Sequence, residues 1–373
     1  MKIGILKENK TEKRVALLPE AVAELVKGGH EILVETGAGA TAWASDGDYQ
    51  KAGAKTVTRA EALKAPLLLG ILAPENNELS TLEAGQIFVG SVNPLGNSAL
   101  AATLIEKGLT LFSLDIIPRT TRAQAMDVLS SMATVSGYKS VLTAANMLPR
   151  FFPMFMSAAG TIKPAKMLIL GAGVAGLQAI ATARKLGAVV EVFDVRSAVK
   201  EEVKSLGGKF VEVEGAREDA AAGGYAVEQT EEFKEKQRQL IHERGMAADI
   251  IIGTAQIPGR KAPVLITRKT VEAMRPGSLI IDLAASTGGN CELSRNGETY
   301  EHHGVTIMGK SDFPTDMPTD ASRMYGRNLL NFLKLMLQKD GTLALDFNDD
   351  LIKGTCIAHK GEVVSERVKQ FLA

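Results

Sequence analysis

Three glycines at a fixed spacing are the residues of this sequence whose types most clearly indicate chemistry. Gly171, Gly173 and Gly176 form the pattern Gly-x-Gly-x-x-Gly directly after an apolar run at 167–170. In a strand–turn–helix unit this pattern makes a tight turn and lets the backbone approach a pyrophosphate. The N-terminus of the following helix attracts the negative charge. The pattern therefore predicts a dinucleotide-binding turn.

The residues that follow the glycines support this interpretation. A second apolar run at 189–193 ends on Asp194, and an acid about 20 residues after the glycines is part of the pattern. Asp194 would accept hydrogen bonds from adenosine ribose hydroxyls and repel a 2′-phosphate, which favours NAD(H) over NADP(H). Arg196 points the other way, because an arginine here can accommodate that phosphate. An ordinary tight turn of structural role would use the same glycines, but it would not need the acid.

A second polar group precedes this unit. Gln124, Asp127 and Ser130 follow one another at intervals of three residues, and Arg119 comes shortly before them. In the helix that we predict at 122–147, this spacing places the three side chains on one face. They offer donors and acceptors suited to a carboxamide, ribose hydroxyls or phosphate. An amphipathic helix with a capped first turn explains the spacing equally well.

The segment 214–226 interrupts the regular pattern. It separates a predicted strand from a charged helix at 231–243, and Tyr225 is its single large apolar residue. Small residues suit a lid that covers a bound ligand, with Tyr225 at its tip. An irregular surface loop is the alternative.

Histidines and cysteines give little sign of other chemistry. The chain has five histidines and two cysteines, and no histidine follows the predicted strands that end at Leu72 and Ser91. No His-x-x-x-His or paired-cysteine spacing indicates a metal, and we expect none. A nicotinamide site without an obvious acid–base pair suits hydride exchange between two nicotinamides, which needs only positioning. Reduction of a carbonyl or imine would need a proton donor.

The order of the predicted elements defines the fold class. Short apolar strands alternate with short helices, including one at 79–85, up to residue 114, and strands and helices alternate again from 166 to 308. This alternation is typical of α/β proteins with parallel sheets. We therefore predict two doubly wound, Rossmann-like domains joined by long helices at 122–147 and 328–338.

The second long helix would return the chain to the first domain, where segments 343–347 and 355–358 would complete it. The first domain would then be discontinuous and comprise residues 1–132 and 320–373. Residues 133–319 would form the domain that carries the dinucleotide turn.

Composition excludes several classes of partner. Lysine plus arginine and aspartate plus glutamate both number 43 among 373 residues, so no global basic surface would attract nucleic acid. We see no signal peptide and no apolar run of about 18 residues, and we expect no direct insertion into a membrane. Two isolated cysteines are typical of reduced thiols in a cytosolic protein.

Longer motifs carry a resemblance to a known family. The chain resembles the soluble NAD(H)-binding alpha subunit (domain I) of proton-translocating NAD(P) transhydrogenase, within the superfamily that also contains alanine dehydrogenase. The similarity runs from KIGILKE and RVALLPE to GTCIAHKGE near the end. The motifs that carry it most specifically are PRTTRAQAMDVLSSMATVSGY (118–138), LGAGVAGLQAIATARKLGAVV, AGGYA (222–226), TAQIPGRKAPVLIT (254–267) and LAASTGGNC (283–291).

The resemblance implies roles for particular residues. It places the nicotinamide, its ribose and the pyrophosphate against Arg119, Gln124, Asp127 and Ser130. Tyr225 and Gly224 would belong to the mobile loop of the family. The remaining cofactor-binding positions that it implies, together with the glycine pattern, are Gly171, Ala172, Gly173, Val174, Gly176, Asp194, Val195, Arg196, Gln237 and Gln256.

The resemblance also implies partners and an activity. Family members form a homodimer that docks an NADP(H)-binding beta subunit, and hydride passes directly between NADH and the NADP⁺ on that subunit. Proton translocation occurs in separate membrane-spanning segments, so the implied location is cytoplasmic, peripheral on the inner face of the cytoplasmic membrane. The chain would be a self-standing subunit or a truncated domain.

Two other functions stay open on the sequence. The first is a stand-alone NAD-dependent amino-acid dehydrogenase of the alanine type. Those enzymes use a lysine and a histidine after two first-domain strands, and the corresponding stretches here, LLLGILAPENN and IFVGSVNPLGN, contain neither. The second is a non-catalytic NAD(H) sensor.

Overall fold

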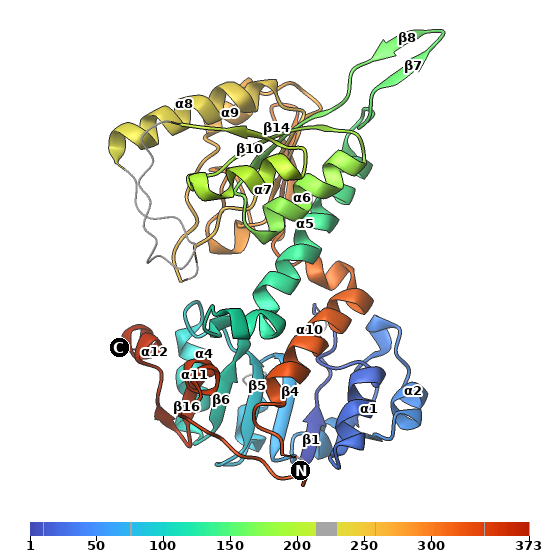
Figure 1. Ribbon diagram of the computed structural model, residues 1–373, viewed down its shortest axis with the longest axis vertical. Helices are drawn as coiled ribbons and strands as arrows, with labels where there is room; N and C mark the ends of the chain where they lie inside the picture. The colour runs from blue at the N-terminus through green and yellow to red at the C-terminus, as the bar shows by residue number, and fades with distance from the viewer. Residues whose placement is uncertain (10, 75–76, 214–229, 258, 339, 373) are drawn as a thin grey trace. The chain divides into compact units, whose positions relative to one another are not determined.

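The chain folds into two compact α/β units in a computed structural model (Figure 1). The structure describes residues 1–373 except 10, 75–76, 214–229, 258, 339 and 373. Unit 1 comprises Met1–Met132 and Pro314–Ala373, and unit 2 comprises Ala133–Phe313. The predicted fold class, α/β with two Rossmann-like domains of which the first is discontinuous, is confirmed.

Unit 1 is built on an eight-stranded sheet in the order β17-β16-β6-β5-β4-β1-β2-β3. The strands from β6 to β3 in this order are parallel, whereas β16 and β17 add antiparallel edges. The strands are β1 (Lys2–Ile5), β2 (Glu31–Glu35), β3 (Lys55–Val57), β4 (Leu67–Leu72), β5 (Ile87–Ser91), β6 (Thr110–Ser113), β16 (Cys356–His359) and β17 (Glu362–Val363).

Both faces of this sheet are covered, which explains why its strands are nearly continuously apolar. Leu67 and Leu69 of β4 pack into one core, and Leu68 between them packs into the other. The helices of unit 1 are α1 (Pro19–Lys27), α2 (Asp46–Lys51), α3 (Arg59–Ala62), α4 (Ser98–Glu106), α10 (Pro318–Leu333), α11 (Asp350–Thr355) and α12 (Glu366–Leu372). Side-chain capping boxes begin α2 and α3, because a capping hydroxyl and an acid three residues later satisfy the first free N–H groups.

Unit 2 contains a seven-stranded sheet in the order β11-β10-β9-β12-β13-β15-β14, in which β14 alone is antiparallel. The strands are β9 (Lys166–Leu170), β10 (Val189–Phe193), β11 (Lys209–Val211), β12 (Ile250–Gly253), β13 (Leu279–Asp282), β14 (Thr299–His302) and β15 (Val305–Gly309). From β9 the chain proceeds to β10 and β11 on one side, and then returns to β12 and β13 on the other. The switch point between β9 and β12 is where doubly wound folds bind ligands.

Helices cover both faces of this sheet. Met167 and Ile169 of β9 pack into one core, and Leu168 and Leu170 pack into the other. The helices are α6 (Val174–Lys185), α7 (Lys200–Ser205), α8 (Glu231–Ala247) and α9 (Arg268–Ala273). Helix α5 (Val128–Met147) begins in unit 1 and continues in unit 2.

A small hairpin extends away from the seven-stranded sheet (Figure 1). Its strands are β7 (Phe155–Ser157) and β8 (Gly160–Ile162), and every residue of both strands is exposed. Phe155, Met156 and Ile162 are among the exposed large apolar side chains. The sequence pattern did not predict this hairpin, because its short strands have no buried face.

Three predicted helices have different limits in the structure. The helix predicted at 122–147 begins at Val128, after a 3₁₀ segment at Thr121–Met126. The helix predicted at 328–338 begins ten residues earlier, at Pro318, and ends at Leu333. The helix predicted at 79–85 is a 3₁₀ turn at Leu79–Thr81. Among the helices that the structure describes, none is long and apolar enough to cross a lipid bilayer.

Gly137 tests the packing that supports the start of α6. This glycine of α5 faces Ala175 so closely that an added Cβ would lie 2.1 Å from the Ala175 carbonyl oxygen. A Gly137→Ala substitution should therefore destabilise unit 2 by about 2 kcal/mol, despite the better helix propensity of alanine. We expect the Tm to fall by roughly 4–8 °C in calorimetry.

Gly47→Ala is the matched control, because Gly47 also lies in a helix and its added Cβ would meet only the Ser45 Oγ, at 3.7 Å. A Tm of the Gly137→Ala variant as high as that of the control would contradict the close approach of α5 and α6.

Candidate functional site

The glycine turn after β9 has the close contacts that the sequence pattern predicts. Gly171 adopts a φ of 100°, a conformation that glycine takes at little cost. An added Cβ on Gly171 would lie 2.6 Å from the Thr254 Oγ1, and one on Gly176 would lie 2.0 Å from the Gly171 carbonyl oxygen. These two glycines therefore allow the turn, the helix and the neighbouring strand to pack together.

The middle glycine differs from the other two because it faces open space. Gly173 is the N-cap residue of α6, and an added Cβ there would have no atom within 4 Å. Val174, the first residue of the helix, is 41% exposed. The first N–H groups of a helix lack partners within the helix and carry partial positive charge. An anion such as a pyrophosphate could approach this helix end.

Asp194 ties the end of β10 to the glycine turn. Its Oδ2 accepts a hydrogen bond from the Ala172 N–H at 2.7 Å and one from the Arg196 Nη2 at 2.7 Å. Its Oδ1 accepts hydrogen bonds from the Arg196 N–H and Nε, both at 2.9 Å. The carboxylate is 7% exposed, and its hydrogen bonds to Arg196 raise the pKa of that guanidinium.

This arrangement uses the whole hydrogen-bonding capacity of the carboxylate. An ionised carboxyl group has about four acceptor positions, and the Ala172 and Arg196 donors fill four. A diol could therefore bind Asp194 only if the Arg196 side chain moved away. Arg196 thus competes with a ligand for Asp194 in the structure as it stands.

The second wall of the turn comes from the segment after β12. The Thr254 Oγ1 donates to the carbonyl oxygens of Leu170 and Gly171, at 3.0 and 3.1 Å. Asn290, which is fully buried, accepts from the Ala255 N–H and donates to the Ala255 carbonyl oxygen, both at 2.9 Å. The exposed Gln256 follows, and its Nε2 donates to the Leu283 carbonyl oxygen at 3.0 Å.

Asp282 holds the loop that supports this wall. Its carboxylate accepts hydrogen bonds from the Cys291 N–H and the Ser294 Oγ, and burial raises its pKa. No role for Thr254, Asn290 or Asp282 follows from the sequence alone. Their signal was weak, because all three types are common in turns and their partners are distant in sequence.

The other predicted residues of unit 2 lie near this frame or outside the described residues. Val195 packs against one of the two cores of the unit. Gln237 is buried in α8. Gly224 and Tyr225 fall within 214–229, outside the described residues.

The polar group of unit 1 is arranged differently from the prediction. Gln124 lies in the 3₁₀ segment, whereas Asp127 has an extended backbone directly before α5. The prediction of one continuous helical face for Gln124, Asp127 and Ser130 is therefore wrong. The Asp127 carboxylate accepts hydrogen bonds from the Ser130 N–H at 2.9 Å and the Ser130 Oγ at 2.6 Å, so it caps the helix. Arg119 and Gln124 are exposed.

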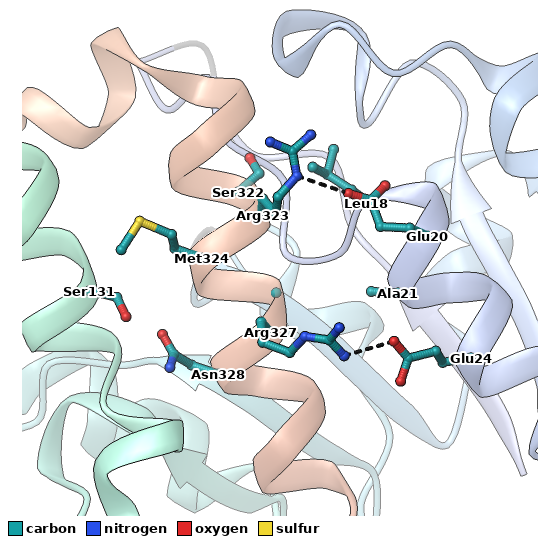
Figure 2. Close-up of a pocket in the computed structure, with 11 residues that line it drawn as sticks. Leu18, Glu20, Ala21, Glu24, Ser131, Ser322, Arg323, Met324, Arg327 and Asn328 are labelled. Carbon is teal, nitrogen blue, oxygen red and sulfur yellow. Dashed lines mark hydrogen bonds and ion pairs between the residues drawn. The ribbon is translucent and has the colours of Figure 1, made fainter.

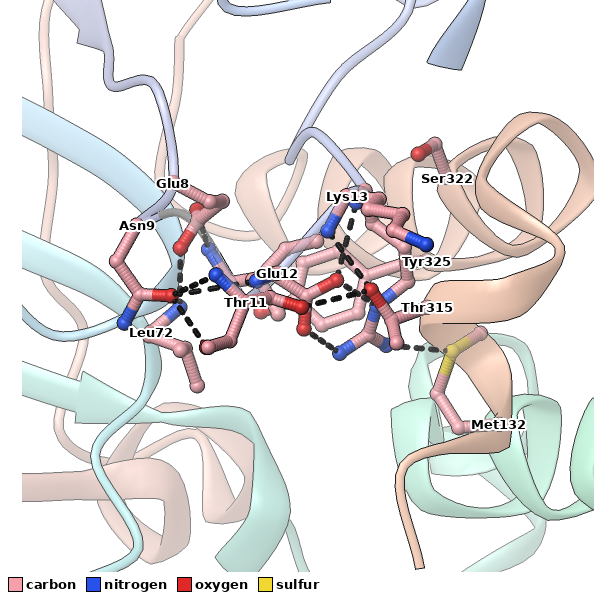
Figure 3. Close-up of polar contacts among 12 residues, drawn as sticks. Glu8, Asn9, Thr11, Glu12, Lys13, Leu72, Met132, Thr315, Ser322 and Tyr325 are labelled. Atoms are coloured by element: carbon pink, nitrogen blue, oxygen red, sulfur yellow. Dashed lines mark hydrogen bonds and ion pairs between the residues drawn. The ribbon is translucent and has the colours of Figure 1, made fainter. Parts of the chain in front are cut away.

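A buried polar cluster in unit 1 was not predicted (Figure 3). The Arg14 guanidinium donates to both oxygens of Glu12, at 2.8 and 2.6 Å, and to the Met132 Sδ at 2.9 Å. The Glu8 carboxylate accepts hydrogen bonds from the backbone N–H groups of Ile71 and Leu72, at the end of β4. Because charged residues normally indicate a surface loop, their run at 7–14 gave no sign of burial.

A pocket of about 490 Å³ lies between α1 and α10 in the same unit (Figure 2). Arg323 pairs with Glu20 at 3.3 Å and Arg327 pairs with Glu24 at 2.7 Å across it. These pairs are largely exposed and satisfy each other, so they present no unpaired charge for a ligand. The glycine turn remains the stronger candidate.

The comparisons with known proteins agree with this geometry. The family model described as Alanine dehydrogenase/PNT, N-terminal domain, matches residues 4–136, and the model described as Alanine dehydrogenase/PNT, C-terminal domain, matches residues 140–366. The chain is 44% identical over 375 aligned positions to an NAD(P) transhydrogenase alpha subunit of Rhodospirillum rubrum, with 98% of each chain covered.

Solved structures show the same relationship. The transhydrogenase from Sinorhizobium meliloti matches with a TM-score of 0.89 and 42% identity, covering 98% of this chain and 100% of that one. An L-alanine dehydrogenase matches with a TM-score of 0.83 and 27% identity, covering 100% of both chains. The chain therefore belongs to the alanine dehydrogenase/PNT family and, within it, to the family of NAD(P) transhydrogenase alpha subunits.

Glu8 gives a testable pH dependence of stability. Burial raises the pKa of Glu8 from 4.5 to about 7, so the folded protein holds this proton at pH values where the unfolded chain has lost it. The contribution of Glu8 to stability should therefore fall as the pH rises from 5 to 8. Glu8→Gln removes this loss, and its stability relative to wild type should increase by about 2 kcal/mol over that range.

The measurement is urea unfolding followed by circular dichroism at pH 5 and pH 8. Glu106→Gln, a change at an exposed glutamate of α4, is the control and should show no such difference. Equal pH dependence in the Glu8→Gln variant and wild type would contradict the raised pKa.

Proposed function

We propose that the chain is the NAD(H)-binding subunit of a proton-translocating transhydrogenase. In this function, hydride passes directly from NADH on this chain to NADP⁺ on a partner subunit. The observation that carries the proposal is the glycine turn at the β9–β12 switch point, with Asp194 at the end of the adjacent strand. The family membership of the chain supports the same reaction.

The residues of unit 2 fit the adenosine half of a dinucleotide. The open space at Gly173 and the N-terminus of α6 suit the pyrophosphate, with Ala172 and Val174 in the same turn. Asp194 suits the ribose diol once Arg196 has moved, because each carboxylate oxygen then regains an acceptor position. The small contacts at Gly171 and Gly176 keep the turn tight. NAD(H) is therefore the proposed cofactor.

We assign the nicotinamide half to the residues that the transhydrogenase motif contains. Gln124 would orient the ring through its amide, and Arg119 would hold negative charge of the cofactor. The Asp127–Ser130 pair fixes the start of α5 and would present the Ser130 hydroxyl. Tyr225 and Gly224 would cover the bound cofactor, with Gln237 and Gln256 beside it. Bound NADH supplies the hydride, and these residues position the ring and exclude water.

A transfer of this kind needs no general acid–base pair on the chain. Lysine and histidine are both absent from the sequence after β4 and β5, at 73–78 and 92–97. Alignment of two rings gives the rate advantage of an intramolecular reaction. This feature favours a nicotinamide acceptor over a keto acid with ammonia.

The proposal includes the assembly in which the chain would act. We infer a homodimer that docks an NADP(H)-binding beta subunit, with proton translocation in a membrane-spanning subunit. The exposed apolar residues of the β7–β8 hairpin support contact with a second copy, because exposed apolar groups of this kind often mark interfaces. The location would be cytoplasmic, peripheral on the inner face of the cytoplasmic membrane.

NADH oxidation by the purified chain under two conditions tests the function. One reaction contains the NADP(H)-binding component of a transhydrogenase with an NADP⁺ analogue, and the other contains pyruvate and ammonia. We expect oxidation in the first reaction only. Oxidation in the second would instead establish an amino-acid dehydrogenase. NADH binding without oxidation in either would indicate a sensor.

Asp194 and Arg196 give a second prediction, on nucleotide preference. Asp194→Asn removes the negative charge that repels a 2′-phosphate, so the ratio of the NADPH to the NADH dissociation constant should fall roughly tenfold, about 1.4 kcal/mol. Arg196→Ala removes the competing guanidinium and should leave NADH binding as tight as in wild type or tighter.

The measurement is fluorescence titration of each variant with NADH and NADPH. Glu191→Gln is the control, because Glu191 lies in the same strand but pairs with Lys209 and Arg244. An unchanged preference in Asp194→Asn would rule out the assigned role of this carboxylate.

A further inference from the structure

Two histidines and a glutamate meet at the edge of unit 2 where β15 begins. The donor atoms of Glu272, His302 and His303 all lie within 4.8 Å of one another. The His302 Nε2 is 3.1 Å from the Glu272 Oε1, and the two imidazole rings are 4.7 Å apart between centroids. No spacing in the sequence indicates this group, because Glu272 belongs to α9, 30 residues before His302.

The turn between β14 and β15 brings the two histidines to one side. His302 pairs with Val305, so His303 and Gly304 are the two residues of the hairpin loop. Both have positive φ, 51° and 75°, as a type I′ turn requires. Adjacent residues of a strand point to opposite faces, and the left-handed backbone of His303 returns its ring to the side of His302.

The backbone around this turn is held by its neighbours. The Gly277 N–H donates to the Gly304 carbonyl oxygen at 2.7 Å, and the Thr306 N–H donates to the Ser278 carbonyl oxygen at 3.0 Å. An added Cβ on Gly304 would lie 2.9 Å from the Pro276 Cβ. The segment that links α9 to β13 therefore packs directly against the turn, which keeps Glu272 near both histidines.

We propose that Glu272, His302 and His303 form a binding site for a divalent transition-metal ion of the zinc type. Two imidazole nitrogens and one carboxylate oxygen are a donor set for Zn²⁺, and a water molecule completes the tetrahedron. Nitrogen donors disfavour Mg²⁺ and Ca²⁺, which prefer oxygen. Donor atoms around tetrahedral Zn²⁺ lie about 3.4 Å apart, close to the 3.1 Å that already separates His302 and Glu272.

The charges at the group favour a cation of this kind. Glu272 is ionised, because its hydrogen bond with His302 lowers the pKa of the carboxyl group. Arg268, one turn earlier on α9, reaches the same carboxylate at 3.9 Å and is a weak competitor for it. His303 is exposed, so an ion can reach the site from solvent.

The site is separate from the glycine turn and does not depend on the proposed function. The turn between β14 and β15 lies at the amino end of β15, whereas the glycine turn follows the carboxyl end of β9, and β15, β13, β12 and β9 are parallel. The two sites therefore lie at opposite edges of one sheet. A bound ion would link the end of α9 to the β14–β15 hairpin.

Calorimetric titration of the full chain, free of any affinity tag, with ZnCl₂ tests the site. A parallel titration with CoCl₂ reports the coordination through visible absorption. Wild type should bind one equivalent of metal. His303→Asn and Glu272→Gln should each weaken binding at least roughly tenfold. Asparagine tolerates positive φ, so His303→Asn should keep the turn and the melting temperature.

Glu301→Gln is the matched control, because Glu301 is an exposed neighbour in β14 outside the donor group, and it should bind as wild type does. The absence of zinc binding by wild type would overturn the proposal. Equal affinity in His303→Asn and wild type would also overturn it, because the bound ion would then be an adventitious ion only.

Discussion

The Asp194 carboxylate is the interaction on which the geometry of the candidate site depends. It joins the end of β10 to the glycine turn through the Ala172 N–H and is itself held by Arg196. The turn and the strand end are thereby fixed at the switch point of the sheet, where parallel strands leave room for a ligand. The same four hydrogen bonds mean that a ribose must displace Arg196, so cofactor binding exchanges one set of charge-assisted contacts for another.

Much of this arrangement could be predicted from the sequence, because the signals are local. The glycine spacing and the acid after the second strand lie within one strand–helix–strand unit, whose parts are neighbours in the chain. Apolar runs such as 167–170 also indicated strands that are buried on both faces. Helix limits were less accurate: Asp127 is a helix cap, and a cap residue three positions from its partner resembles a position within the helix.

The remaining features depend on contacts between distant segments. Asn290 braces Ala255, Glu8 accepts hydrogen bonds from the end of β4, and Glu272 meets His302 across 30 residues. Each uses a polar residue type that is usually exposed, so composition and periodicity suggest solvent. Their partners are set by the packing of the sheets, which a reading of local pattern does not supply.

Isotope transfer tests the central claim, that hydride passes directly between two nicotinamides without a proton donor. NADH deuterated at the transferred position would be mixed with this chain, the NADP(H)-binding component and NADP⁺ in ordinary water. Mass spectrometry of the NADPH product should find one deuterium per molecule. A product that carries hydrogen from the solvent would contradict direct transfer and require an acid–base group that exchanges with water.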